Sequence, residues 1–229
     1  MKNTDSDLQK ALLDHLLEFI TPNRKSLFEK VIANRTRHIT VVLEDIYQPH
    51  NASAVLRTCD LTGIQDVYII ENSNQYDVNP DVALGASKWL NLIKYNQTEQ
   101  NTLHAFKKLR EQGYRIVAST PHKNDQDLES IPLDGKMAIV FGTELNGLSD
   151  VAIENADEFL KIPMFGFTES YNISVSAALI LFTLTNRLRK ASVHWSLSEN
   201  EKQEILLEWS RRSIKRSDIL ENQFLKKLK

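Results

Sequence analysis

The sequence predicts an α/β fold with a mostly parallel sheet that is covered by helices on both faces. Two observations support this prediction. Short β-like runs alternate with helical segments across residues 38–190, and a long apolar segment that begins at residue 173 directly follows a polar loop. A polar loop on top of a buried helix is where α/β proteins usually bind ligands. We therefore expect a ligand site beside residues 162–182.

Apolar runs and turn residues define the expected elements of this core in chain order. Strands are expected at residues 38–45, 66–70, 91–95, 114–118, 136–141 and 158–162, and helices at 51–63, 82–89, 101–112, 149–156 and from 173 onward. Asn51 or Ser53 is suited to cap the first helix, Gly63 to end it, and Ser149 to cap the fourth. The last helix has apolar residues on every side, which predicts a buried helix rather than a surface one.

Both ends of the chain are expected to be helical and locally basic. Residues 5–20, 23–37 and 198–228 carry apolar residues at helical spacing. Residues 23–37 hold five basic residues against one acidic residue, and residues 206–229 hold seven against three. These segments are either solvated helix faces or arms that contact nucleic-acid phosphates. The expected parts of the chain are a helical extension at 1–37, a core at 38–190 and a second extension at 191–229.

Composition excludes several classes of protein. The 229 residues are 41% hydrophobic and 25% charged, with a net charge of −2, which is ordinary for a soluble globular chain. The longest apolar run is shorter than the ~20 residues of a membrane span, and the N-terminus lacks a signal-peptide core. Cys59 is the sole cysteine, which excludes an internal disulfide and a cysteine-rich metal site. We expect a cytoplasmic protein without a membrane segment or a metal.

Three polar loops follow predicted strands, and in a parallel sheet such loops lie on one edge and can form one site. They are PHNASAVLR at residues 49–57, FGTELNGLS at 141–149 and FTESYNIS at 167–174, and STP at 119–121 follows a fourth strand. Arg57 stands in an otherwise apolar helix, where a buried guanidinium needs an anionic partner.

The other polar residues of these loops have structural alternatives. Asn51 can be a helix cap, and Ser170 and Asn172 can cap the long helix together. Glu144 can satisfy backbone amides, while Gly142 and Gly147 can serve either a tight turn or the close approach of a ligand. Arg187 and Arg189 can complement the dipole of the long helix at its last turn.

Taken together, NASAVLR, FGTELNGLS and IPMFGFTESYNISVSAALILF resemble, in order and spacing, the three motifs of the SpoU branch of the SPOUT RNA methyltransferases. The resemblance covers about residues 38–190, the third motif is the most specific, and GASKW at 85–89 is also similar to the family pattern. It implies a deep trefoil knot in the C-terminal part of the sheet, a homodimer, and S-adenosylmethionine held in the knotted loops. The basic helical ends resemble those of family members that act on tRNA.

The resemblance also implies roles for individual residues. Arg57 matches the proposed catalytic group that helps to deprotonate a ribose hydroxyl, and Tyr171 replaces an aliphatic residue of many relatives, so that only its main chain is implicated. The residues implied to position substrate or cofactor beside Arg57 are Asn51, Glu144, Ser170 and Asn172. Those implied to hold the cofactor are Ser119, Thr120, Gly142, Ile162 and Tyr171. Those expected to contact RNA are Arg35, Arg37, Arg187, Arg189, Arg211 and Arg212.

The activity that the resemblance implies is methylation of a ribose 2′-hydroxyl in tRNA, at guanosine 18 of the D-loop. The alternatives are the same reaction on ribosomal RNA, a catalytically silent RNA-binding protein, and a doubly wound nucleotide-binding protein. The last alternative predicts a glycine-rich turn after the first strand, and the segment there, PHNAS, has no glycine. An arginine normally stays protonated, with a pKa above ~12. Arg57 is therefore either a base coupled to a phosphate or an electrostatic stabiliser of the developing alkoxide, and neither role requires a metal.

Overall fold

The computed structural model describes residues 2–76, 80–121, 126–143 and 145–227. The chain divides into two compact units, one formed by Met1–Arg35 together with Ser196–Lys229 and the other by Thr36–Trp195. The two basic ends, which were expected as separate extensions, thus pack into one helical unit. Among the described residues, no helix combines the length and the apolar character needed to cross a membrane.

The larger unit contains a seven-stranded sheet in the order β3-β2-β1-β6-β4-β7-β5, and every strand pairing is parallel. The strands are β1 (Ile39–Glu44), β2 (Asp66–Ile70), β3 (Asn91–Tyr95), β4 (Arg115–Ser119), β5 (Gln126–Asp127), β6 (Met137–Phe141) and β7 (Glu158–Lys161). The predicted α/β class and six of these strands are confirmed. The two-residue β5 was not predicted, because a segment this short has no periodicity to detect.

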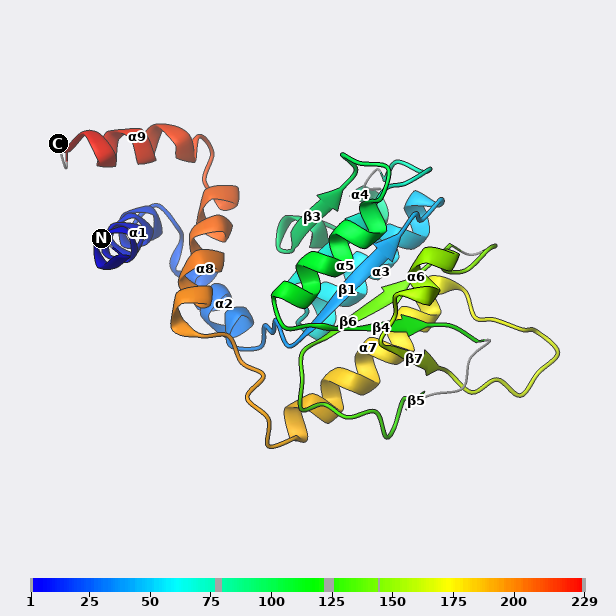
Figure 1. Cartoon of the computed structure of the whole chain (residues 1–229). Helices are drawn as coiled ribbons and strands as arrows, with labels where there is room; N and C mark the ends of the chain where they lie inside the picture. Colours follow the sequence, from blue (N-terminus) through cyan, green and yellow to red (C-terminus); the bar gives the residue numbers. More distant parts are fainter. Residues whose placement is uncertain (1, 77–79, 122–125, 144, 228–229) are drawn as a thin grey trace. The chain divides into compact units, whose positions relative to one another are not determined.

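Helices cover both faces of the sheet (Figure 1). They are α3 (Pro49–Thr62), α4 (Pro80–Ala83), the 3₁₀ helix η1 (Ala86–Lys88), α5 (Asn101–Glu111), α6 (Asp150–Glu154) and α7 (Ile173–Lys190). Helices α3 and α7 enclose one core and α5 and α6 the other. On β1, Val41 and Leu43 point into the first core and Val42 into the second, so the strand is apolar at every position.

The smaller unit consists of α1 (Lys2–Leu17), α2 (Pro22–Ile32), α8 (Glu199–Ser213) and α9 (Ser217–Lys227). Helix α1 packs against α8 and α9, and Leu16 and Leu207 lie in the core between them. Thr21 caps α2 and Pro22 stands at its first position, where the missing N–H costs nothing. Ser198 begins α8 with a capping box.

Two sequence-based expectations about helices are wrong. Asn51 and Ser53 do not cap α3 but lie inside it, because Gln48 is the N-cap and Pro49 begins the helix. Helix α7 is not wholly buried, since Val175, Leu179 and Phe182 are exposed in the single chain. Other local predictions are confirmed, because Gly63 ends α3 in the left-handed region and the Ser149 side chain caps α6.

Candidate active site

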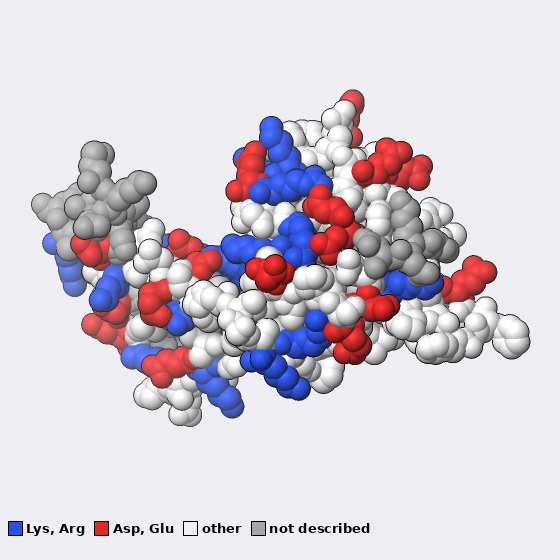
Figure 2. Space-filling model, turned by 60° about the horizontal axis from the view of Figure 1, so that its bottom comes forward, with Lys and Arg blue, Asp and Glu red and all other residues white. Residues whose placement is uncertain are grey.

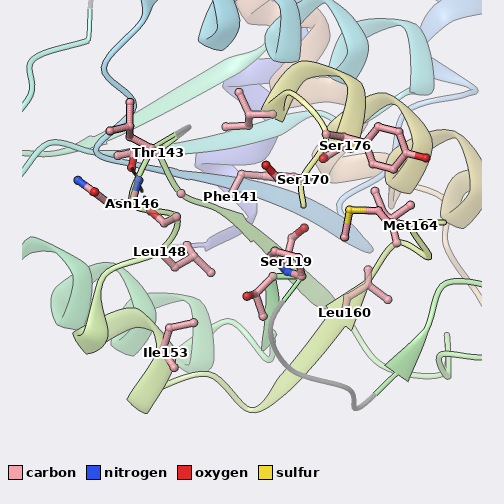
Figure 3. A pocket seen from close by; sticks show the side chains of 18 residues that line it. Ser119, Phe141, Thr143, Asn146, Leu148, Ile153, Leu160, Met164, Ser170 and Ser176 are labelled. Carbon is pink, nitrogen blue, oxygen red and sulfur yellow. Dashed lines mark hydrogen bonds between the residues drawn. The ribbon is translucent and has the colours of Figure 1, made fainter. Parts of the chain in front are cut away.

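A cavity of about 330 Å³ lies at the carboxyl edge of the sheet, where the loops after β4, β6 and β7 meet the first turn of α7. Side chains from these separate segments surround a common space, among them Ser119, Met164 and Ser170 (Figure 3). Its lining includes hydroxyl and amide groups as well as apolar side chains. Its lining is Ser119, Thr120, Pro121, Phe141, Gly142, Thr143, Leu145, Asn146, Gly147, Leu148, Ile153, Leu160, Ile162, Met164, Ser170, Tyr171, Ile173 and Ser176.

The loop after β6 forms a closed turn over this cavity. Thr143 N–H donates to Gly147 O at 2.8 Å, and Gly147 N–H donates to Thr143 O at 3.1 Å. Gly147 has φ +68°, a backbone conformation that glycine adopts without strain. A Cβ on Gly142 would lie 2.2 Å from Gly147 O, so the turn leaves no room for a side chain there. Both glycines are therefore required by the turn, which in turn shapes one wall of the cavity.

The far end of the same loop is tied to the sheet by a buried carboxylate. Glu44 at the end of β1 accepts hydrogen bonds from Ser149 N–H at 3.0 Å, Ser149 Oγ–H at 2.7 Å and Thr102 Oγ1–H at 2.7 Å. Ser149 Oγ also accepts from Ala152 N–H at 3.1 Å and so caps α6. The loop between Gly142 and Ser149 is thus anchored at both ends.

Asn172 connects the third polar loop to the first. Its Oδ1 accepts from Ser174 N–H at 2.8 Å and from Ser174 Oγ–H at 2.6 Å, which caps α7. Its Nδ2 donates to Asn51 Oδ1 at 3.2 Å. Of the two residues expected to cap α7, Asn172 does so, and Ser170 lines the cavity instead. The cap therefore joins two motifs that lie 121 residues apart.

Most of the residues predicted for the site come together. Ser119, Thr120, Gly142, Ile162, Ser170 and Tyr171 line one cavity, while Asn51 and Asn172 are bonded to each other beside its α7 wall. Arg57 is outside the lining and is exposed, so the expectation of a buried guanidinium is wrong. It lies on the side of α3 that also exposes Leu61, one turn further along. Glu144 lies outside the described residues.

The two arginines predicted in the last turn of α7 are there, and both donate to carbonyl groups of this chain. Arg187 donates to Leu128 O and Ile131 O, each at 2.8 Å. Arg189 donates to Thr62 O at 2.8 Å and lies over the Trp195 ring, 5.8 Å from its centroid, and burial lowers the pKa of its guanidinium. These contacts hold segments of the core together, so they do not require an RNA partner.

The arginines expected to contact RNA from the two ends of the chain differ in accessibility. Arg35 is only 1% exposed, with its guanidinium 5.4 Å from the centroid of the Trp209 ring, which does not fit a phosphate contact. Arg37 pairs with Asp66 at 2.9 Å. Arg211 pairs with Glu221 and Glu208, and these hydrogen bonds, led by Glu221, raise its pKa. Arg212 is exposed.

Sequence reasoning missed much of the apolar lining. Met164 and Leu148 stand inside the quoted motifs, so their position beside polar loop residues was a signal that they belong to the site. Ile153 comes from α6, and nothing in its sequence surroundings indicates that it reaches the cavity. Among the described residues, no group of three or more His, Cys, Asp or Glu side chains could hold a metal ion.

Comparison with protein-family models matches residues 38–182 to the model described as the SpoU rRNA Methylase family. The chain belongs to the SpoU family. This result confirms the resemblance seen in the three motifs, since residues 38–182 contain all of them.

Individual SpoU relatives extend the similarity beyond the family domain. The tRNA (guanosine(18)-2'-O)-methyltransferase of Borreliella burgdorferi is 44% identical over 218 residues, which cover 95% of this chain and 98% of the relative. The enzyme of the same name from Thermus thermophilus is 31% identical over 194 residues, which cover 84% of this chain and 98% of the relative. The crystal structure of the A. aeolicus TrmH/SpoU tRNA modifying enzyme superposes with a TM-score of 0.75 at 26% identity, covering 85% of this chain and 98% of that one.

Proposed function

We propose that this SpoU-family chain methylates the ribose 2′-hydroxyl of guanosine 18 in tRNA, using S-adenosylmethionine, as a homodimer in the cytoplasm. The observation that carries the proposal is the 44% identity to a tRNA (guanosine(18)-2'-O)-methyltransferase over 95% of the chain. That similarity extends past residues 38–182 into the terminal helices. Ribosomal RNA as the substrate is less well supported, because the helical ends are part of what is shared with the tRNA enzyme.

The cavity suits the proposed donor. Its volume of about 330 Å³ is within the range of small-molecule sites, which starts at about 300 Å³. Apolar side chains such as Leu148 and Leu160 suit a nucleoside base, and the hydroxyls of Ser119, Thr120 and Ser170 suit its polar groups. When bound, S-adenosylmethionine supplies an electrophilic methyl group on a sulfonium. Gly142, which lines the cavity and has no room for a side chain, would let the donor approach the backbone of this turn without an added charge.

The residues of the first and third motifs are proposed to prepare the ribose hydroxyl. A 2′-hydroxyl is a weak acid, so its alignment and the removal of its proton both limit the reaction. Arg57 would act on that hydroxyl, either as a base coupled to a phosphate or by stabilising the alkoxide, which is worth ~3–4 kcal/mol for one good donor. Asn51, Asn172, Ser170 and Glu144 would align the groups around it.

The homodimer is proposed from an exposed apolar surface on the larger unit. Val175, Leu179 and Phe182 are 44%, 40% and 66% exposed and recur along α7 at spacings of four and three residues, which places them on one side of the helix. Leu61 on α3, the helix that packs against α7, is 77% exposed. A second copy that covered this surface would also reduce the water around Arg57 and strengthen its electrostatic effect.

The deep trefoil knot is likewise a proposal, drawn from the SpoU motifs and from the path of the chain. Strand β7 lies near one edge of the sheet, beyond β4. The chain then returns and packs α7 against α3, the helix that connects β1 with β2 (Figure 1). Such a return is the path that a threaded C-terminal segment would take.

Contact with tRNA is proposed to involve the helical unit. Residues 1–35 and 196–229 hold 14 Lys and Arg against 11 Asp and Glu, whereas residues 36–195 hold 14 against 19. Basic and acidic side chains are interspersed on the face that Figure 2 shows, so attraction of this face to phosphate must be local. Arg212, Lys215 and Arg216 are exposed around the connection between α8 and α9 and suit such a contact.

Methyl transfer to defined transcripts tests the proposal. The purified chain, incubated with donor labelled in the methyl group and a tRNA transcript, is expected to label the ribose of guanosine 18. A transcript with 2′-deoxyguanosine at that position is the matched control and should take up no label. Label at another nucleotide, or no label from a folded chain that binds S-adenosylhomocysteine, would overturn the proposed function.

A further inference from the structure

The loop between β7 and α7 carries two phenylalanines that face solvent. Phe165 and Phe167 are 97% and 109% exposed, more than any other large apolar side chain in the described part of the chain. The loop reaches away from the edge of the sheet (Figure 1), and a Cβ on Gly166, between the two rings, would meet only Thr168 N at 4.0 Å. Both rings therefore offer flat apolar surface to a partner.

These two rings stand beside the cavity without lining it. Met164 and Ser170, one before them and one after them in the loop, both line the cavity (Figure 3). Phe165 directly follows Met164, and Phe167 is separated from Ser170 by roughly 10 Å of extended chain at most. Phe165 and Phe167 thus belong to the rim of the cavity, and we call them the aromatic rim.

The size of the cavity leaves the target nucleotide to be bound at this rim. The cavity holds about 330 Å³, near the lower end of the ~300–1,000 Å³ that small-molecule sites span. S-adenosylmethionine, a nucleoside joined to an amino acid, would occupy that space. The ribose hydroxyl must still reach the methyl group, so the target nucleotide has to bind at the mouth. Its base must then rest on residues outside the lining.

The chemistry of the loop suits a base and not a phosphate. Glu169 is the only charged residue in the segment 162–174, so this segment has no Lys or Arg with which to attract a phosphate. Aromatic rings instead stack on the faces of unpaired bases, which is a common way for proteins to hold single-stranded RNA. An uncharged pair of rings beside the donor cavity is therefore matched to a nucleobase.

We infer that the aromatic rim is the surface on which the base of the target nucleotide stacks, while its ribose faces the donor. This inference rests on the proposed function and deepens it, because it assigns residues that receive the base of guanosine 18. A base held against Phe165 and Phe167 is removed from its neighbours in the RNA, which exposes the 2′-hydroxyl beside it. The rim acts on the affinity for tRNA and leaves donor binding unchanged, since neither ring lines the cavity.

A second copy of this chain is the other candidate to cover the rim. The surface proposed for the dimer lies on α7, whereas the rim lies in a loop without regular structure. The two occupants make different demands on the side chain. Packing against a protein surface accepts leucine in place of phenylalanine at small cost, whereas stacking on a base requires a flat ring.

Two paired variants and two transcripts test the inference. Phe165→Leu with Phe167→Leu removes the rings, and Phe165→Trp with Phe167→Trp keeps aromatic rings. Phe19→Leu is the matched control, because Phe19 is a 52% exposed phenylalanine of the helical unit. Each protein is titrated, in the presence of S-adenosylhomocysteine, with a tRNA transcript that has guanosine at position 18 and with one that has an abasic ribonucleotide there.

The Leu pair is expected to raise Kd for the guanosine transcript by about tenfold, as the loss of a stacked base predicts. The Trp pair and the control should stay within about twofold of the wild type. On the abasic transcript all four proteins should bind alike, because no base is left to stack on. Any effect of the missing base on the tRNA itself is common to the four proteins and cancels in this comparison.

Several results would overturn the inference. These are a Leu pair within twofold of the wild type on the guanosine transcript, equal losses on both transcripts, or a Trp pair as weak as the Leu pair. A Leu pair that sediments as a monomer while the wild type is a dimer would assign the rim to a second copy. If the wild type methylates guanosine 18, such results refute the rim alone. A wild type that labels no guanosine 18 refutes the proposed function, and the inference with it.

Discussion

Gly142→Ala is expected to open the turn after β6 and to weaken binding of the donor and its demethylated product. The new Cβ would lie 2.2 Å from Gly147 O, 2.3 Å from Gly147 C and 2.4 Å from Leu148 N, all of them backbone atoms. Non-bonded carbon contacts have their optimum at about 3.5–4.0 Å. The turn must therefore move by about 1 Å, and no side-chain rotation can absorb the change.

The size of the effect follows from what holds this turn closed. Two backbone hydrogen bonds join Thr143 and Gly147, at 2.8 and 3.1 Å, and each contributes about 0.5–1.5 kcal/mol. If the variant must restore the turn in order to bind ligand, about 2 kcal/mol is lost from binding. That loss corresponds to an increase in Kd of about thirtyfold.

Calorimetric titration with S-adenosylhomocysteine measures this change. Gly166→Ala is the matched control, because a Cβ there meets only Thr168 N at 4.0 Å and should leave Kd unchanged. Circular dichroism establishes that both variants are folded. A folded Gly142→Ala variant that binds within twofold of the wild type would refute the proposal that this turn holds the donor.

Three further predictions concern Arg57, the dimer and the effect of pH. Arg57→Ala should lower single-turnover methyl transfer by about 100-fold while tRNA binding persists in a filter assay, and transfer within a few-fold of wild type would contradict its assigned role. Leu179→Glu with Phe182→Glu should convert a dimer into a monomer in sedimentation, whereas a monomeric wild type at micromolar concentration would refute the dimer. Burial lowers the pKa of His38 below its ordinary value of 6.5, so the unfolded chain binds this proton at a higher pH than the folded chain does. The free energy of unfolding should therefore fall as pH drops below 6.5. Urea unfolding at pH 5.5 and 7.5 should show a smaller difference in stability for His38→Gln than for the wild type.

The strands and the convergence of the loops could be predicted because both depend on local patterns. Val41 to Leu43 read as a strand that is buried on both faces, and a parallel sheet brings the carboxyl ends of such strands to one edge. Ser119, Gly142 and Ser170, which belong to three different loops, therefore line one cavity as expected. Residue order along the chain was enough for this part of the site.

The environments of the arginines could not be predicted, because each depends on a partner that is distant in sequence. Arg35 is buried against Trp209, which comes from the opposite end of the chain. Arg187 donates to carbonyls that lie 59 and 56 residues before it. A basic residue in a sequence marks a charge, but only the packed structure decides whether that charge faces solvent or a carbonyl group.

The same reasoning explains why contacts between segments that are distant in sequence matter for the chemistry of the motifs. The loops that line the cavity lack regular structure, so their rigidity has to come from contacts with elements that are already fixed. Glu44 supplies such a contact to Ser149 across 105 residues, and Asn51 supplies one to Asn172 across 121. Because each contact joins elements that are distant in sequence, the site can form only after these elements have packed together. A substitution at Glu44 should therefore disturb the donor site even though its carboxylate lies outside the cavity lining.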